Sequence, residues 1–162
     1  MWVCRAGKDA VYLDYYIETS RIYLAWDGFK INLKDIAEKK EYRAIVSKEK
    51  GTENPTSISN WAGQLNSFAN EMKKGDYVLI PHKGSQFFEL VQVSGEYEYY
   101  ESNNKKLYHS REIKNIASNI PKSIFPQSIQ YGLRAYRTIY KVKNEEDILD
   151  IIKRWKQKET IN

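Results

Sequence analysis

The sequence predicts an α+β protein in which about six short strands form a small β-barrel flanked by helices. Several short segments rich in β-branched and aromatic residues are bounded by Gly, Asn or Asp, as strands joined by turns are. Other segments carry apolar residues every three or four positions, which is the spacing of one helix face. The chain has 162 residues, of which 41% are apolar. This length and composition suit a single hydrophobic core.

Each expected strand is a short apolar run that ends at a turn signal. Residues 21–26 read Arg-Ile-Tyr-Leu-Ala-Trp and stop at an Asp-Gly pair. Pro81 closes another strand, at a position where the ladder needs no further N–H donor. The full set of expected strands is residues 2–5, 21–26, 76–81, 87–94, 95–100, 107–116 and 137–142.

The clearest helix is predicted over residues 61–72. Its apolar residues fall at i, i+4, i+7 and i+11, on one helix face. They are Trp61, Leu65, Phe68 and Met72. Gly75 is expected to end this helix in the left-handed conformation, just after two lysines whose charge suits a helix C-terminus.

Two further helices are expected, one over residues 32–43 and one after Asn144. Asn32 is expected to be the N-cap of the first. The second begins with a run of carboxylates, which favours the positive end of a helix dipole. Its apolar face is predicted to consist of Ile148, Ile151, Ile152 and Trp155.

The remaining segments give weaker signals. Residues 10–17 carry three tyrosines and a valine that could line a short helix. Residues 47–59 are the most loop-like stretch, with Gly, Pro, Asn and several Ser and Thr residues. Residues 120–128 contain Pro121 and Pro126 and are therefore expected to be irregular or only briefly helical.

We expect one domain over residues 1–142, with a C-terminal helix at 143–162 that packs on it or leads to a partner domain. The single cysteine, Cys4, cannot form an internal disulfide, which favours a reducing compartment. No run of apolar residues is long enough for a membrane span, and the first residues do not resemble a secretory signal. A cytoplasmic protein without membrane partners is therefore expected.

The sequence offers little for catalysis. His82 and His109 are the only histidines, so with one cysteine no zinc set of the usual spacing can be built. Glycine-rich phosphate loops are missing. Glu89 lies in a strand but lacks the lysine of a nuclease motif, and Asp76 is explained as a turn residue. We expect a binding protein rather than an enzyme, with no metal and no cofactor.

The charge and the aromatic residues permit a nucleic-acid partner. The net charge is +5 and the sequence pI is about 9.1. A basic surface attracts phosphates, although charge alone does not demand such a partner. The 13 Tyr and 4 Trp exceed what a core of this size requires, and their flat faces with polar tips suit binding surfaces.

Several motifs resemble EVE-type domains of the PUA-like superfamily. The hallmark is a Trp-x-Gly-x-x-Asn helix, here 61–66, followed by Met-Lys-x-Gly-Asp at 72–76 and a hydrophobic strand. The opening Trp-Val-Cys-Arg-Ala-Gly is similar to that of the N-terminal domains of Mrr-type restriction endonucleases. Further matches follow in the same order up to about residue 142. They are Trp26, Pro81, Gly95, Tyr97, Tyr99, Ile120, Pro121, Ser123 and the run 137–140. Ala25 and Leu65 depart from the usual Gly and Arg.

This resemblance implies a PUA-like fold, similar to EVE and YTH domains, that swings a modified base out of nucleic acid into an aromatic pocket. It implies a modified-DNA-binding specificity module of a modification-dependent restriction or phage-defence system. The partner would be duplex DNA carrying a modified base, with any nuclease in another domain or chain. A reader of methylated RNA is one alternative. A protein-interaction domain that binds no nucleic acid is another.

Candidate site residues fall into two groups. The expected base pocket comprises Trp26, Trp61, Tyr97, Tyr99, Asn66 and Ser85. The two tyrosines share one side of a strand by its two-residue period, whereas the helical spacing of Trp61 favours packing over a place in the pocket. The expected contacts to the nucleic-acid backbone are Arg5, Lys8, Lys83, Lys105, Lys106, His109 and Arg111.

Overall fold

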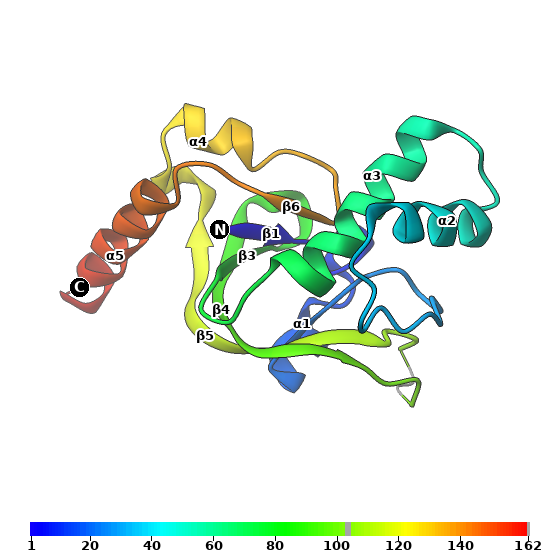
Figure 1. Ribbon diagram of the computed structural model, residues 1–162. Coiled ribbons are helices and arrows are strands. Elements are labelled where there is room, and N and C mark those ends of the chain that lie inside the picture. Colours follow the sequence, from blue (N-terminus) through cyan, green and yellow to red (C-terminus); the bar gives the residue numbers. More distant parts are fainter. Residues whose placement is uncertain (103–104, 162) are drawn as a thin grey trace.

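The computed structural model describes residues 1–102 and 105–161, and it confirms the α+β class. Six strands form one curled sheet, a half-barrel with helices on both faces (Figure 1). The order is β2-β5-β4-β3-β1-β6. The strands are β1 (Trp2–Cys4), β2 (Arg21–Tyr23), β3 (Tyr77–Pro81), β4 (Phe87–Tyr99), β5 (His109–Pro121) and β6 (Ile139–Lys141). Among the strand pairs of the described residues, only β1–β3 is parallel. The strands β2 and β6 are the two edges of this sheet.

The two longest strands, β4 and β5, bend the sheet. Their register shifts three times, most widely between Val93 and Tyr97, and such bulges increase the local bend and twist. Gly95 lies at this bulge, and a Cβ there would be 2.8 Å from the Cβ of Glu112. The prediction of two separate strands at 87–94 and 95–100 was therefore wrong, because the chain continues through the bulge as one strand.

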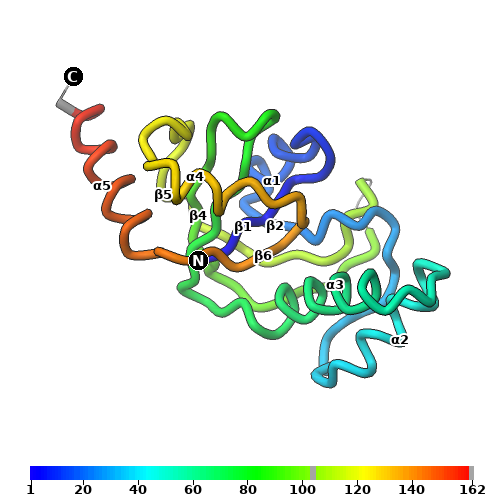
Figure 2. Tube along the Cα trace, turned by 90° about the horizontal axis from the view of Figure 1, so that it is seen from above, coloured from blue at the N-terminus to red at the C-terminus, as the bar shows by residue number. Residues whose placement is uncertain are grey.

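Alternate residues of the inner strands enter two different cores. Trp2 of β1 and Val78 of β3 belong to one apolar cluster, whereas Val3 and Leu79 belong to the other. This is the two-residue period of a sheet that is covered on both faces. The first cluster packs under α1 (Leu13–Thr19), α2 (Lys39–Lys50) and α3 (Pro55–Asn66). The second packs under α4 (Gln127–Gly132) and α5 (Glu145–Ile161), on the other side (Figure 2).

The hallmark helix begins earlier than predicted. Asn54 caps it, since its side chain accepts a hydrogen bond from Ser57 N at 3.1 Å, and Pro55 occupies the first turn. The predicted loop at 47–59 was therefore wrong at both ends, because α2 extends to Lys50 and α3 begins at Pro55. The helix widens into a π-helical turn at Ser67–Glu71, and Gly75, with φ 93°, lies in the following turn rather than at the helix end. The predicted apolar face is otherwise confirmed, with three of its four residues buried and Trp61 half-buried.

The helix predicted at 32–43 was displaced by seven residues. The side chain of Asn32 accepts a bond from Lys34 N at 2.9 Å and so forms a turn instead of a cap. Asp35 has φ 68°, which no helix interior allows. The helix α2 starts only at Lys39. Residues 24–38 are consequently irregular, and Trp26 follows β2 instead of ending it.

The C-terminal helix is confirmed as α5, and its Ile148 and Ile152 are buried against the sheet. Residues 120–128 contain the end of β5, a single 3₁₀ turn at Lys122–Ile124 and the start of α4, which agrees with an irregular or briefly helical segment. Among the helices of the described residues, none combines the length and apolarity needed to cross a membrane.

Candidate nucleic-acid interface

Two of the predicted base-pocket residues, Trp26 and Trp61, are in contact, and other side chains of the protein partly cover both. Their ring centroids are 5.2 Å apart. Phe29 stacks on Trp26 at 4.3 Å with an interplanar angle of 10°. The ammonium of Lys50 lies 4.2 Å from the Trp26 ring and 4.0 Å from the Trp61 ring, which is a cation–π contact. Desolvation lowers the pKa of Lys50. A base stacking here would have to displace groups of the protein itself.

Tyr97 and Tyr99 extend the same aromatic cluster on the far side of His109. The His109 ring lies 5.9 Å from Tyr97 and 5.0 Å from Tyr99, and it stacks on Phe29 at 4.9 Å. His109 is fully buried and Phe29 is nearly so. The centre of this cluster is therefore filled, and none of the four predicted aromatic residues lines either of the two cavities described below.

His109 fixes the irregular segment onto the sheet, and its predicted phosphate contact was wrong. Its Nε2 lies 2.9 Å from the Phe29 carbonyl oxygen, which can only accept, so Nε2 carries the hydrogen. Its Nδ1 then accepts from the Tyr97 hydroxyl at 2.6 Å, and that hydroxyl accepts from Leu33 N at 3.0 Å. Burial lowers the pKa of His109 from 6.5 to about 4 and raises the pKa of Tyr97. The ring is neutral at pH 7.

Arg111 is also buried, and its predicted phosphate contact was wrong for the same reason. Its Nη1 donates to the carbonyl oxygens of Phe68 and Met72 at 3.1 and 2.8 Å. Its Nη2 donates to the carbonyl of Gly95 at 3.1 Å. The guanidinium thus satisfies carbonyls at the end of the π-helical turn and at the β4 bulge. The signal available in the sequence was its two-residue spacing from Ile113, a core residue.

Four other predicted residues do converge. Arg5, Lys8, Lys83 and Ser85 line one cavity of about 750 Å³, which we call the cationic cavity. Its walls are loop 5–10, turn 81–85 and segment 134–138, with single contributions from Ala25 and Lys122. The charged side chains of the described lining, apart from His82, are Arg5, Lys8, Lys83, Lys122, Arg134 and Asp9. Such an excess of positive charge in a concave site attracts anions.

The segment 134–138 was not expected to be part of a site. The guanidinium of Arg5 donates to the carbonyl oxygen of Ala135 from Nε and Nη2, at 3.1 and 2.6 Å. Arg5 N donates to the Thr138 carbonyl at 2.8 Å. Tyr136 is 96% exposed, and the guanidinium carbon of Arg5 lies 5.8 Å from its ring centroid. The only signal in the sequence was a tyrosine that stands between two arginines, Arg134 and Arg137.

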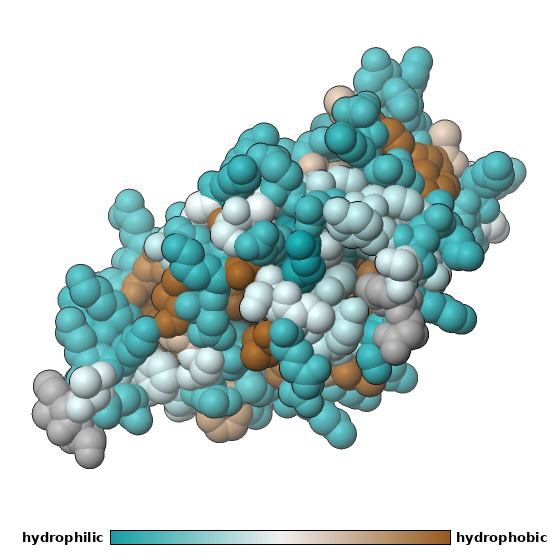
Figure 3. Space-filling model, turned by 90° about the horizontal axis from the view of Figure 1, so that it is seen from below, coloured by the Kyte–Doolittle hydropathy of each residue, from teal (hydrophilic) through white to brown (hydrophobic). Residues whose placement is uncertain are grey.

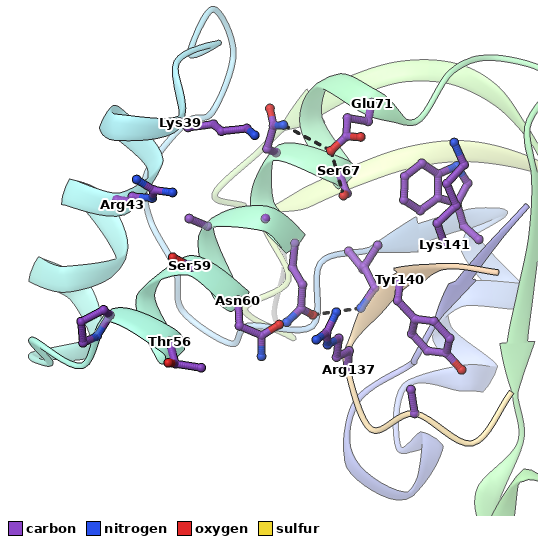
Figure 4. Close-up of a pocket in the computed structure, with 18 residues that line it drawn as sticks. Lys39, Arg43, Thr56, Ser59, Asn60, Ser67, Glu71, Arg137, Tyr140 and Lys141 are labelled. Carbon is purple, nitrogen blue, oxygen red and sulfur yellow. Dashed lines mark hydrogen bonds between the residues drawn. The ribbon is translucent and has the colours of Figure 1, made fainter. Parts of the chain in front are cut away.

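Asn66 lines a second cavity, which we call the α3 groove. Figure 4 shows this groove with Ser67 and Glu71 at one end of α3 and Thr56 at the other. The groove has a volume of about 1050 Å³ and runs between α2, α3 and residues 135–141. The Asn66 amide donates to Glu71 Oε1 at 3.3 Å, and its oxygen accepts from Asn70 at 2.9 Å. Ser85 and Asn66, both predicted to belong to one base pocket, therefore line different cavities.

Lys105 and Lys106 are exposed beside the β4–β5 connection and line neither cavity. The carbonyl of Lys106 accepts a bond from Gly28 N at 2.9 Å, which ties this residue to the irregular segment.

The face of the molecule in Figure 3, opposite to that of Figure 2, is largely hydrophilic, and polar side chains interrupt its apolar ones. Charged and polar groups therefore dominate this face as well.

The two acids considered for catalysis have structural partners. Glu89 is buried and lies 2.7 Å from His82 Nε2, and it accepts from Asn119 N at 2.8 Å. Asp76 accepts from the Trp2 indole N–H at 3.0 Å and from Lys73 N at 2.9 Å. Within residues 1–102 and 105–161, no three His, Cys, Asp or Glu side chains are grouped as metal ligands would be.

The structure thus defines an α+β domain with a curled mixed sheet and two cavities rich in cationic side chains. The family described as Domain of unknown function (DUF8426) matches residues 2–143, and the chain belongs to this family. The matched region ends just before α5, close to the boundary expected from the sequence. A comparison with curated proteins gives no match.

Proposed function

We propose that this protein is a PUA-like, EVE-type module that binds duplex DNA and holds a modified base in the cationic cavity. One observation carries the proposal. Arg5, Lys8, Lys83 and Ser85 come from two distant parts of the chain, and they line the same cavity. The resemblance to N-terminal domains of Mrr-type endonucleases supports a role in modification-dependent restriction or phage defence. The nuclease then belongs to another domain or chain.

The roles proposed for the lining follow from exposure and chemistry. Lys8 and Lys83 are exposed and are suited to phosphates, which position a duplex without reading its sequence. The half-buried Ser85 hydroxyl can donate to or accept from a base edge. Tyr136 offers the exposed aromatic face that the packed cluster around His109 does not. Stacking on such a face is worth roughly 1–3 kcal/mol per base.

The energetics favour a base that is modified or weakly paired. Extruding a base from a duplex costs a few kcal/mol, and the cost is lowest where pairing is already weakened. Stacking on Tyr136 and bonds to the cavity wall would offset that cost. An added methyl group brings apolar surface to the base. Burial of this methyl group beside Tyr136 would therefore favour the modified base over the plain one.

The test is a fluorescence anisotropy titration with matched duplexes that carry cytosine, 5-methylcytosine, adenine or N6-methyladenine at one position. Wild-type protein should bind one modified duplex more tightly than its plain counterpart. Lys83→Glu should weaken that binding at least tenfold, whereas the matched charge reversal Lys153→Glu on α5 should not. Equal and weak binding of all duplexes would reject the proposal.

The RNA alternative is tested in the same experiment, because the 2′-hydroxyl is what distinguishes the two nucleic acids. Tighter binding of a methylated single-stranded RNA than of every DNA duplex would reassign the substrate to RNA. No binding to either nucleic acid would favour the protein-interaction alternative.

A further inference from the structure

We propose that the α3 groove is a second anion site, which holds the phosphodiester backbone of the nucleic acid whose base enters the cationic cavity. This inference rests on the proposed function for the identity of the polyanion. The site itself is argued from the charges, the exposed polar groups and one glycine that line the groove.

Two pairs of cations flank the groove. Lys39 and Arg43 are four residues apart on α2 and so lie on one helix face, with a rise of about 6 Å between them. Arg137 precedes β6 and Lys141 is the last residue of β6, and both line the groove. Figure 4 shows the two pairs on opposite sides of α3. None of the four takes part in the ion pairs found among the described residues.

The one carboxylate of the lining, Glu71, takes part in none of the ion pairs found among the described residues, and the four cations outnumber it. Glu71 accepts bonds from Asn66 Nδ2 at 3.3 Å and from Ser67 Oγ at 3.2 Å, so it is held against α3. The floor of the groove adds exposed hydroxyl and amide groups from Thr56, Ser59 and Asn60 (Figure 4). Lysine, arginine, hydroxyl and amide side chains together are the usual donors to phosphate oxygens.

Gly63 gives an independent indication of a ligand. It is exposed in the interior of α3, where glycine is less stable than alanine. A Cβ at this position would have no heavy atom within 4 Å, so packing within the protein does not require a glycine. The missing side chain leaves a flat strip on the groove floor, over which a ligand's backbone can approach closely.

A thin wall separates the groove from the cationic cavity. In segment 134–139, Arg134, Tyr136 and Thr138 line the cavity, whereas Ala135, Arg137 and Ile139 line the groove. The wall is therefore a single extended segment whose side chains point alternately to the two sides. Phosphates in the groove would place the adjoining nucleotide next to this wall, and its base could reach Tyr136 across it.

The first test neutralises one cation on each side of the groove, in the variant Arg43→Gln/Arg137→Gln. The control is Lys153→Gln/Lys158→Gln on α5, which lies at the other end of the molecule (Figures 1 and 2). For the modified duplex, the plot of log K against log salt should become shallower by about 1.8 in the groove variant, at about 0.9 per phosphate contact. The preference for the modified base should not change. A slope equal to that of the control would overturn the inference.

The second test uses Gly63→Gln, with Gly63→Ala as its matched control. Both should raise Tm by about 2–4 °C, because each replaces a helical glycine in open space. Gly63→Gln should nevertheless bind the duplex about tenfold more weakly, since its side chain covers the groove floor. Opposite changes in stability and binding are not produced by a purely structural role. Wild-type affinity in Gly63→Gln would count against the groove.

An abasic single-stranded phosphodiester oligomer separates the two proposals, because it has a backbone but no base. Groove-dependent binding of this oligomer without any preference among duplexes would overturn the proposed function and retain the groove. A preference for a modified duplex that the groove variants leave intact, together with an unchanged salt slope, would retain the function and overturn the groove.

Discussion

Arg111 and Lys83 are both basic residues at or beside strands, and the sequence predicts a phosphate contact for each, yet their surroundings are opposite. Arg111 is 2% exposed and donates to three backbone carbonyls, whereas Lys83 is exposed on a turn beside a cavity. The difference lies in the neighbouring positions. Arg111 shares a strand face with a core residue, while Lys83 follows Pro81, where β3 ends. A basic residue on the core-facing side of a strand is therefore more informative about folding than about binding.

The aromatic residues repeat this contrast. Trp26, Phe29 and His109 stack against one another and fill the space where a base pocket was expected. The cationic cavity instead carries one exposed aromatic ring, that of Tyr136. The following predictions test whether the region around His109 supports the fold and the cationic cavity supports binding.

The largest effect is expected for Arg111→Ala. Removing the guanidinium leaves the carbonyls of Phe68, Met72 and Gly95 without this partner inside the protein. Each buried acceptor that is left without its partner costs about 1–3 kcal/mol, so a total loss of about 3 kcal/mol or more is expected. Urea denaturation followed by circular dichroism should show this loss in the free energy of unfolding. A loss below 1 kcal/mol would mean that Arg111 is available to ligands after all.

Gly7→Ala should lower the free energy of unfolding nearly as much as Arg111→Ala does, although Gly7 lines the cationic cavity. Gly7 has φ 80° and ψ 179°, a conformation that is almost restricted to glycine. A Cβ there would lie 2.8 Å from the Tyr12 ring. The strain should cost about 3 kcal/mol, at the upper end of the range for such residues. Thermal unfolding of the variant would measure it. Wild-type stability would show that loop 5–10 can rearrange.

The pH dependence of stability should report on His109. Its pKa is about 4 in the folded protein against 6.5 when unfolded, so between these values the unfolded chain binds more protons. The free energy of unfolding should therefore fall as the pH is lowered, by about 2 kcal/mol between pH 7 and pH 5. Denaturation of wild type at several pH values would measure the fall, and His109→Gln should show a clearly flatter profile.

The smallest effect on stability is expected for Lys83→Gln. Its side chain is exposed, and surface substitutions of this kind usually change the free energy of unfolding by less than about 0.5 kcal/mol. Affinity for the modified duplex should fall measurably in the same preparation. If Lys83→Gln lowered the free energy of unfolding as much as Arg111→Ala, the contrast between the cationic cavity and the region around His109 would disappear.

Much of the fold could be predicted from patterns that do not depend on distant partners. The strand that ends at Pro81, the apolar face of the hallmark helix and the amphipathic α5 all follow from periodicity. The displaced helix shows the limit. Residues 32–43 have a helical pattern, but Leu33 N is bonded to the hydroxyl of Tyr97, 64 positions away in the sequence. No local pattern contains that partner.

The site was only partly predictable for the same reason. Charge and turn position predicted Lys8, Lys83 and Ser85, which line one cavity, because residues in turns depend less on packing than residues in the core. Tyr97 and His109 were misjudged because their partners lie in the irregular segment, whose path the sequence does not reveal. Arg134 and Tyr136 were overlooked because they belong to no regular element and match no motif.

The position of β1 in the sheet has a consequence for how the chain folds. Trp2 pairs with Val78 on one side and with Lys141 on the other. During synthesis the first strand therefore has no partner until β3 has emerged, and it gains its second only after β6. Proteins dominated by such distant pairings fold slowly, in milliseconds to seconds. Until then the apolar residues of β1 are exposed, and a nascent chain that pauses before β6 presents an unpaired strand edge to its surroundings.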